Sequence, residues 1–171
     1  MKKLYAPWRS DYTTDTTRGK HDDTNADECV FCTKLATKDD AKQYIIARFK
    51  HHAVLLNLYP YSAGHILILP FEHVKNMHDL SPEARAELME LVTHSIDILK
   101  DTLKADGINV GVNLGKAAGA GIPSHLHWHV LPRWIGDTNF LPLLADTKAV
   151  SYDLNVMYNQ LVEPFKKLTL S

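Results

Sequence analysis

Three histidines alternate at positions 125, 127 and 129, within the stretch GIPSHLHWHVLPRW. Alternate side chains of a β-strand share one face, with neighbours roughly 6.5–7 Å apart along the chain. His125, His127 and His129 would therefore form a row on one face, while the apolar residues between and after them point into the core. Because every buried histidine needs hydrogen-bond partners, three in a row indicate a functional site rather than core packing.

Two kinds of chemistry fit this row. Several imidazoles could bind one metal ion, although such a site normally recruits a further histidine or a carboxylate. Alternatively, one neutral imidazole could attack phosphorus and form a covalent phosphoramidate, provided that a hydrogen bond holds its other ring nitrogen. The preceding loop, residues 116–124, consists mostly of small residues and contains Gly119 and Gly121. Backbone N–H groups of such a loop can approach an anion closely, which favours phosphate binding.

The two cysteines of the chain, Cys29 and Cys32, have C-x-x-C spacing. We find no secretory signal in the first residues, so a structural disulfide is not expected. The spacing suits half of a zinc site or a redox pair. A redox pair usually lies at a helix start within a thioredoxin-like βαβ pattern, which the sequence lacks. Two cysteines without a shared role are the remaining alternative.

The flanking sequence predicts the elements that position these residues. Five strands are predicted at 44–49, 53–58, 65–70, 108–114 and 125–131. A long helix begins after Ser81 as N-cap, with Pro82 as its first residue, and apolar spacing continues it to residue 103. A final helix is expected from about 153 to 167, with Pro164 as a kink or early stop. The polar residues 13–28 predict a loop. The fold class is therefore α+β.

Length and charge exclude several classes of protein. The 171 residues suffice for one domain with a sizeable core. The formal net charge of −1 disfavours a broad nucleic-acid-binding surface. No stretch approaches the roughly 20 apolar residues that span a bilayer. We therefore expect a cytoplasmic protein without nucleic-acid or membrane partners. The remaining histidines are interpreted as ordinary surface residues: His21, His51, His52, His78 and His94.

Taken together, the sequence resembles the histidine-triad (HIT) superfamily of nucleotide hydrolases and transferases. The resemblance is carried by HLHWHVLP at 125–132, GHILILPFEHV at 64–74 and NVGVNLG at 109–115. PRWIGDTNF at 132–140 and the early PWRSDY resemble the branch that contains bacterial diadenosine tetraphosphate phosphorylases and fragile-histidine-triad-like proteins. The resemblance implies an antiparallel sheet of about five strands with one long helix and a C-terminal helix. It also implies a single HIT domain with a core at 29–135, extensions at 1–28 and 136–171, and a homodimer.

The resemblance also implies a role for each catalytic residue. His127 would attack the α-phosphate and become nucleotidylated, His129 would bind phosphate oxygens or the bridging oxygen, and His65 would support the triad from behind. Residues implied to contact the nucleotide are Asn57 at the ribose, Asn113 near the α-phosphate, Gly121 and Ser124 in the phosphate loop, and Leu55 and Leu58 at the base. From sequence alone, Asn57 could equally cap a turn and the two leucines could belong to the core. The loop AGAGIPS is about one residue longer than the glycine-glutamine-serine loop of the family, so its exact phosphate donors stay open.

Some members of the superfamily bind a structural zinc ion, and the resemblance gives the cysteines two partners. The implied zinc ligands are Cys29, Cys32, His73 and His125. Two thiolates and two imidazoles form a closed tetrahedral set, which is typical of structural zinc. A surface position for His73 is the alternative.

Three functions compete at this point. The first is an enzyme that cleaves dinucleoside polyphosphates or related nucleotide conjugates at the α-phosphate, with water or inorganic phosphate as the acceptor. The second is a nucleotide-binding regulatory module with little turnover. The third is a metalloenzyme that uses the histidine row as a catalytic zinc site. The sequence does not reveal the acceptor, the leaving group or the preferred base.

Overall fold

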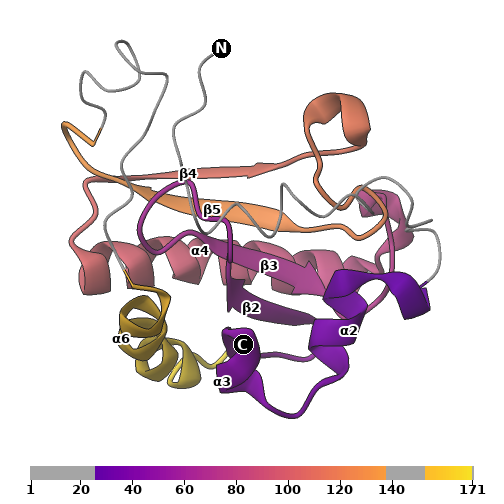
Figure 1. The fold of residues 1–171 in the computed structure, drawn as a ribbon, viewed down its shortest axis with the longest axis horizontal. Coiled ribbons are helices and arrows are strands. Elements are labelled where there is room, and N and C mark those ends of the chain that lie inside the picture. Colours follow the sequence, from indigo (N-terminus) through magenta and orange to yellow (C-terminus); the bar gives the residue numbers. More distant parts are fainter. Residues whose placement is uncertain (1–25, 138–152, 171) are drawn as a thin grey trace.

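A computed structural model describes residues 26–137 and 153–170, and these residues form an α+β fold around one sheet (Figure 1). The sheet has five strands: β1 (Ile45–Arg48), β2 (His52–Leu56), β3 (Ile66–Pro70), β4 (Gly107–Val112) and β5 (Trp128–Arg133). Their order across the sheet is β1-β2-β3-β5-β4, and each neighbouring pair is antiparallel. The predicted fold class is thereby confirmed.

Four α-helices accompany the sheet in the described residues: α2 (Val30–Ala36), α3 (Asp40–Gln43), α4 (Pro82–Leu103) and α6 (Leu154–Lys166). Helix α4 begins where the sequence predicts, because the Ser81 hydroxyl accepts a hydrogen bond from the backbone N–H of Ala84 at 3.1 Å. Asp153 caps α6 in the same way, and this helix continues through Pro164 to Lys166. None of the described helices is both long and apolar enough to cross a bilayer.

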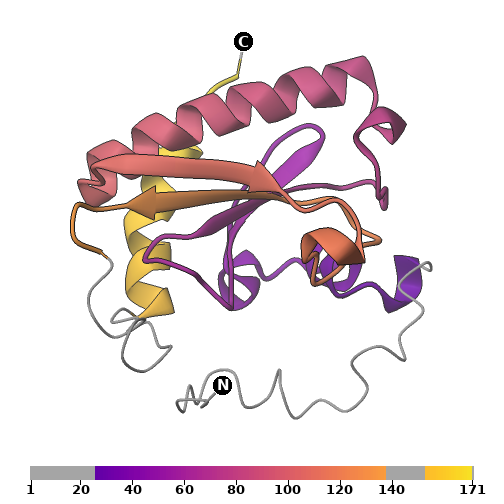
Figure 2. The same cartoon turned by 90° about the horizontal axis from the view of Figure 1, so that it is seen from above.

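The two faces of the sheet bury different clusters. Helices α4 and α6 cover one face, which holds the larger core, and Figure 2 shows α4 running along the sheet on that side. Val54, Ile68 and Trp128 point into this core from β2, β3 and β5. The opposite face carries a smaller cluster in which residues of α2 pack against Leu55 and Leu67. The side chains alternate as predicted, because Leu126, Trp128 and Val130 all belong to the larger core.

Strand β5 begins later than predicted. Its ladder starts at Trp128, so His125 and His127 precede it instead of lying within it. The backbone explains the difference, because the N–H of Leu126 donates to the carbonyl of Val74 at 2.7 Å, outside the sheet. This contact holds the extended segment before β5 against the chain that follows β3. Helix α2 is also absent from the sequence prediction, which left residues 29–35 unassigned.

The prediction that His52 is a surface residue is wrong. Strand β2 starts at His52, one residue earlier than expected, and the side chain is completely buried. Its Nδ1 lies 2.9 Å from Oε1 of Glu87 on α4, and the same carboxylate oxygen accepts the backbone N–H of His51 at 2.8 Å. His52 therefore links the sheet to α4. His78 and His94 are solvent-accessible as expected, whereas His21 lies outside the described residues.

Candidate active site and metal-binding cluster

The His127 imidazole is held in one tautomer by the backbone. Its Nδ1 lies 2.8 Å from the carbonyl oxygen of His125, and a carbonyl can only accept, so Nδ1 carries the proton and donates. The opposite nitrogen, Nε2, then has a free lone pair. Burial lowers the pKa of His127 below its ordinary value of 6.5, which keeps the ring neutral. A neutral imidazole with an accessible lone pair is the form in which histidine acts as a nucleophile.

His129 is held in the opposite tautomer by a chain of hydrogen bonds. The backbone N–H of Tyr61 donates to Nδ1 of His65 at 3.1 Å, so the proton of His65 resides on Nε2. His65 Nε2 donates in turn to Nδ1 of His129 at 2.9 Å. The proton of His129 must therefore be on Nε2, which is buried and has no hydrogen-bond partner among the described residues. His129 thus presents an unpaired N–H donor.

Burial also keeps this pair uncharged. Burial, with a smaller effect of the neighbouring histidines, lowers the pKa of His65 to about 3 and the pKa of His129 to about 4. Because both rings are neutral at physiological pH, the chain of hydrogen bonds defines their tautomers. A phosphate oxygen is the kind of acceptor that the buried N–H of His129 lacks.

The His127 and His129 rings lie side by side. The ring centroids of His127 and His129 are 5.1 Å apart. Tyr61, which is half exposed, stacks on His129 with a centroid distance of 6.0 Å and an interplanar angle of 15°. Leu67 on β3 and Gly111 on β4 are the register partners of His129. The site therefore lies on the face of the sheet opposite α4, at the start of β5.

The residues predicted to contact a nucleotide lie at different depths around this site. Asn57 is half-buried, and its Nδ2 lies 3.2 Å from Nδ1 of His65. Its Oδ1 accepts a hydrogen bond from the backbone N–H of Tyr59, so Asn57 caps a turn and also contacts His65. Leu55 is buried in the smaller cluster, and Leu58 is half-buried beyond the end of β2. Asn113, just after β4, is half-buried, and Gly121 in the following loop is exposed. The Ser124 hydroxyl is buried and has no hydrogen-bond partner among the described residues.

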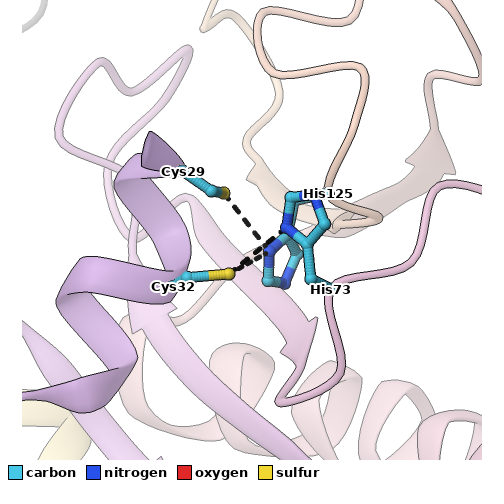
Figure 3. A group of neighbouring side chains, drawn as sticks. All are labelled: Cys29, Cys32, His73 and His125. Carbon is cyan, nitrogen blue, oxygen red and sulfur yellow. Dashed lines mark hydrogen bonds between the residues drawn. The ribbon is translucent and has the colours of Figure 1, made fainter. Parts of the chain in front are cut away.

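Four predicted metal ligands converge on one point (Figure 3). The ligand atoms of Cys29, Cys32, His73 and His125 all lie within 4.8 Å of one another. Nδ1 of His125 is 3.5 Å from Sγ of Cys29 and 3.4 Å from Sγ of Cys32, and Nδ1 of His73 is 3.3 Å from Sγ of Cys32. Tetrahedral zinc, with bonds of about 2.3 Å to sulfur and about 2.05 Å to nitrogen, requires sulfur–nitrogen separations of about 3.6 Å. The donor set therefore fits a structural zinc ion.

The surroundings of the cluster favour a bound cation. His125 Nε2 donates to the carbonyl of Pro70 at 3.0 Å, which leaves Nδ1 unprotonated and facing the cysteines, as in metal-binding histidines. Burial lowers the pKa of His125 to about 4, so the ring is neutral. Burial and the neighbouring Cys29 raise the pKa of the Cys32 thiol to about 11. A thiolate at this position therefore needs a positive charge beside it.

Helix α2 brings the two cysteines to this point. Cys29 is its N-cap residue and Cys32 lies one turn later, so the two thiols share a face of the helix. Phe31, between them in the sequence, packs against His125 and His127. Sequence reasoning missed both Phe31 and Tyr61. Neither had a distinguishing signal in the sequence, because Phe31 falls inside the C-x-x-C motif and Tyr61 inside a turn-forming segment.

Comparisons with known proteins identify similar sequences. The HIT domain matches residues 38–134. AP-4-A phosphorylase of Mycobacterium tuberculosis (strain ATCC 25618 / H37Rv) is 33% identical over 150 residues, which are 88% of this chain and 77% of that protein. The asymmetrical bis(5'-nucleosyl)-tetraphosphatase of Schizosaccharomyces pombe is 32% identical over 89 residues, which are 52% of this chain and 48% of that protein.

Solved structures share the fold. A Zn-bound histidine triad family protein from Mycobacterium smegmatis superposes with a TM-score of 0.66 at 24% identity, covering 84% of this chain and 96% of that one. A hypothetical histidine triad nucleotide-binding protein from Sulfolobus tokodaii has a TM-score of 0.62 at 26% identity, covering 81% of this chain and 92% of that one. The matched domain extends over the sheet and the histidine row, and with the similarity to the phosphorylase over most of the chain it shows that this protein belongs to the HIT domain family.

Proposed function

We propose that this protein is an enzyme that cleaves dinucleoside polyphosphates at the α-phosphate through a nucleotidylated His127, with diadenosine tetraphosphate as the first candidate substrate. The observation that carries the proposal is the pair of opposite tautomers, with a lone pair on Nε2 of His127 and a proton on Nε2 of the adjacent His129. The similarity to the mycobacterial phosphorylase and to the yeast tetraphosphatase supports the choice of substrate.

In the first step, Nε2 of His127 attacks the α-phosphorus. The bond between that phosphorus and the bridging oxygen breaks, and the polyphosphate leaves with the bonding electron pair. The His125 carbonyl, which accepts a hydrogen bond from Nδ1–H, stabilises the positive charge that develops on the His127 ring. The N–H of His129 donates to an oxygen on which negative charge increases, and the Ser124 hydroxyl is a second candidate donor.

In the second step, an acceptor oxygen attacks the same phosphorus. The phosphorus–nitrogen bond breaks and its electron pair returns to Nε2 of His127. With inorganic phosphate as the acceptor, diadenosine tetraphosphate gives ADP and ATP; with water, it gives AMP and ATP. The similarity to the phosphorylase extends over 88% of the chain, whereas the similarity to the tetraphosphatase extends over 52%, so we favour phosphate as the acceptor.

We assign a structural zinc ion to Cys29, Cys32, His73 and His125. When bound, it ties α2 to the segment before β5. The arrangement disfavours a catalytic metal in the histidine row, because Nε2 of His129 carries a proton and because neither His127 nor His129 belongs to the convergent ligand set of the described residues. The binding of zinc by the Mycobacterium smegmatis protein, which shares the fold, is consistent with this assignment.

A homodimer is also part of the proposal. Strand β4 lies at an edge of the sheet and pairs only with β5 within the described residues. Val110 on β4 and Leu114 just after it are large apolar residues with exposed fractions of 43% and 49%. An exposed edge strand with apolar side chains is a ready surface for a second copy. Light scattering after size exclusion measures the mass directly, and Val110→Lys should shift it towards that of the monomer.

The experiment that tests the activity is incubation with diadenosine tetraphosphate, with and without inorganic phosphate, followed by chromatography of the nucleotides. ADP and ATP formed only with phosphate would establish phosphorolysis, whereas AMP and ATP formed without phosphate would establish hydrolysis. Nucleotide binding without turnover would favour the regulatory module. His127→Asn should abolish turnover and the acid-labile labelled protein that a quenched reaction traps.

A further inference from the structure

The helix that carries the two cysteines also reaches the nucleophile. Phe31 lies between Cys29 and Cys32 in the sequence, and its side chain is buried, with 7% exposed. The centroid of its ring is 5.1 Å from that of His127, at an interplanar angle of 60°, and 5.5 Å from that of His125, at 77°. Phe31 therefore contacts one metal-cluster histidine and the catalytic histidine at the same time.

This contact supplies a restraint that the hydrogen bond of His127 lacks. A single hydrogen bond from Nδ1 to the His125 carbonyl fixes one edge of the imidazole, but the ring can still tilt about that edge, because the χ2 torsion of histidine has broad wells. An aromatic ring packed against the imidazole limits the tilt, because such pairs have preferred geometries. Phe31 and the His129 ring, each with its centroid 5.1 Å from that of His127, are the aromatic neighbours that limit the direction of the Nε2 lone pair.

Helix α2 is short and is held on the sheet by its buried residues in the smaller cluster and by contacts at its two ends. It has only seven residues, and Phe31 and Leu35 are its buried positions. A helix of this length is not stable by itself and depends on tertiary contacts. Arg48 holds its C-terminal end by donating to the carbonyl of Leu35 at 2.8 Å. At its N-terminal end, Cys29 and Cys32 approach His125 and His73. Closure of this cluster by a metal would therefore restrain the end of the helix from which Phe31 projects.

We infer that Phe31 is a positioning residue that couples metal binding in the Cys29, Cys32, His73 and His125 cluster to the orientation of the catalytic His127. With the metal bound, α2 is held and Phe31 packs against the His127 ring; without it, the restraint is lost and the nucleophile is misaligned. This inference rests on the proposed function for its effect on turnover, but the orientation of His127 can be measured without any turnover.

The test compares Phe31→Ala and Phe31→Leu with the wild-type protein, all loaded with zinc. Leu35→Ala is the matched control, because Leu35 is the other buried residue of α2 and, unlike Phe31, has no aromatic ring to pack against the histidines. We expect one zinc ion per chain in all four proteins. With diadenosine tetraphosphate, kcat of Phe31→Ala should fall about 10- to 100-fold, since a displacement on the order of 1 Å can cost about 100-fold. KM should change less than kcat, Phe31→Leu should be intermediate, and Leu35→Ala should stay close to wild type.

The readout that does not depend on turnover is the nitrogen-15 NMR signal of the His127 Nδ1–H group and its rate of exchange with solvent. We expect faster exchange in Phe31→Ala than in wild type. Removal of zinc by a chelator should accelerate exchange strongly in wild type and much less in Phe31→Ala, because the two changes act through the same contact. Equal effects of zinc removal in both proteins, or unchanged exchange in Phe31→Ala, would overturn the coupling. If these exchange effects occur without turnover in any of the proteins, the positioning role stands and the proposed activity fails.

Discussion

Replacement of His65 by leucine tests the hydrogen-bond chain that sets the tautomer of His129. His65 does not face the substrate in the proposed mechanism; its Nε2 proton is donated to Nδ1 of His129, and its own Nδ1 accepts from the backbone of Tyr61. Leucine is similar in size and provides neither a donor nor an acceptor. In the variant, His129 is free to carry its proton on Nδ1, which would direct a lone pair instead of a proton at the phosphate.

The size of the effect follows from the burial of this pair. A buried polar group that loses its hydrogen-bond partner costs about 1–3 kcal/mol, which corresponds to about 5- to 150-fold in rate. Complete loss of a donor to a developing oxyanion costs about 100- to 1000-fold, which sets the upper limit. We therefore expect kcat/KM of His65→Leu to fall by about 5- to 150-fold. His65→Gln should recover part of this loss, because its amide can donate to His129.

The assay is the steady-state rate with diadenosine tetraphosphate, together with urea unfolding to separate activity from stability. His52→Leu is the matched control. It also removes a completely buried histidine, but His52 bonds to Glu87 on the α4 face, away from the site. We expect His52→Leu to lose stability and keep its kcat/KM. A folded His65→Leu protein with wild-type kcat/KM would show that His65 does not set the tautomer of His129.

Three further predictions concern stability and the metal. Burial lowers the pKa of His65 from 6.5 to about 3, so the unfolded chain binds a proton at a higher pH than the folded protein, and the free energy of unfolding falls as the pH drops from 6.5 towards 3. Urea unfolding of the metal-free protein should show a loss of roughly 2 kcal/mol from this group by about pH 5. Gly64 has φ +67°, and a Cβ there would collide with the Leu103 side chain, so Gly64→Ala should cost about 1–3 kcal/mol and lower the melting temperature by several degrees. Cys29→Ser should lose the zinc ion that His127→Asn retains, as measured by metal analysis of the purified variants.

The fold was predictable from sequence wherever local signals were strong. Residues 82–103 carry a cap, a proline at the first helical position and a continuous apolar spacing, and all three signals agree with α4 as observed. Helix α2 had no such signals: its N-cap is a cysteine without a side-chain cap bond, and tertiary contacts hold its short length. His52 was misassigned because the partner that makes its burial tolerable, Glu87, lies 35 residues away in the sequence.

The sequence likewise predicted some residues of the candidate site and missed others. The C-x-x-C spacing alone left a zinc site and a redox pair open, and only the resemblance to the HIT superfamily added His73 and His125; the four ligand atoms converge as that resemblance implied. The roles of Tyr61 and Phe31 were not predictable, because aromatic residues occur in turns and cores for many reasons. Their proximity to the histidines arises only when the turn before β3 and helix α2 fold onto the same face of the sheet.

The three histidines of the row differ chemically because each ring has a different hydrogen-bond partner, which determines the nitrogen that carries the proton. The carbonyl of Pro70 accepts a hydrogen bond from Nε2–H of His125, which leaves the Nδ1 lone pair for a metal. The carbonyl of His125 accepts a hydrogen bond from Nδ1–H of His127, which leaves the Nε2 lone pair for attack. His65 donates to Nδ1 of His129, so the proton of His129 is on Nε2. An alternating pattern specifies only the face on which the rings lie. A shift of this segment by one residue would turn all three rings into the α4 core and separate each from its partner. The contact between Leu126 and Val74, which fixes the segment before β5, is therefore as necessary to the proposed chemistry as the histidines themselves.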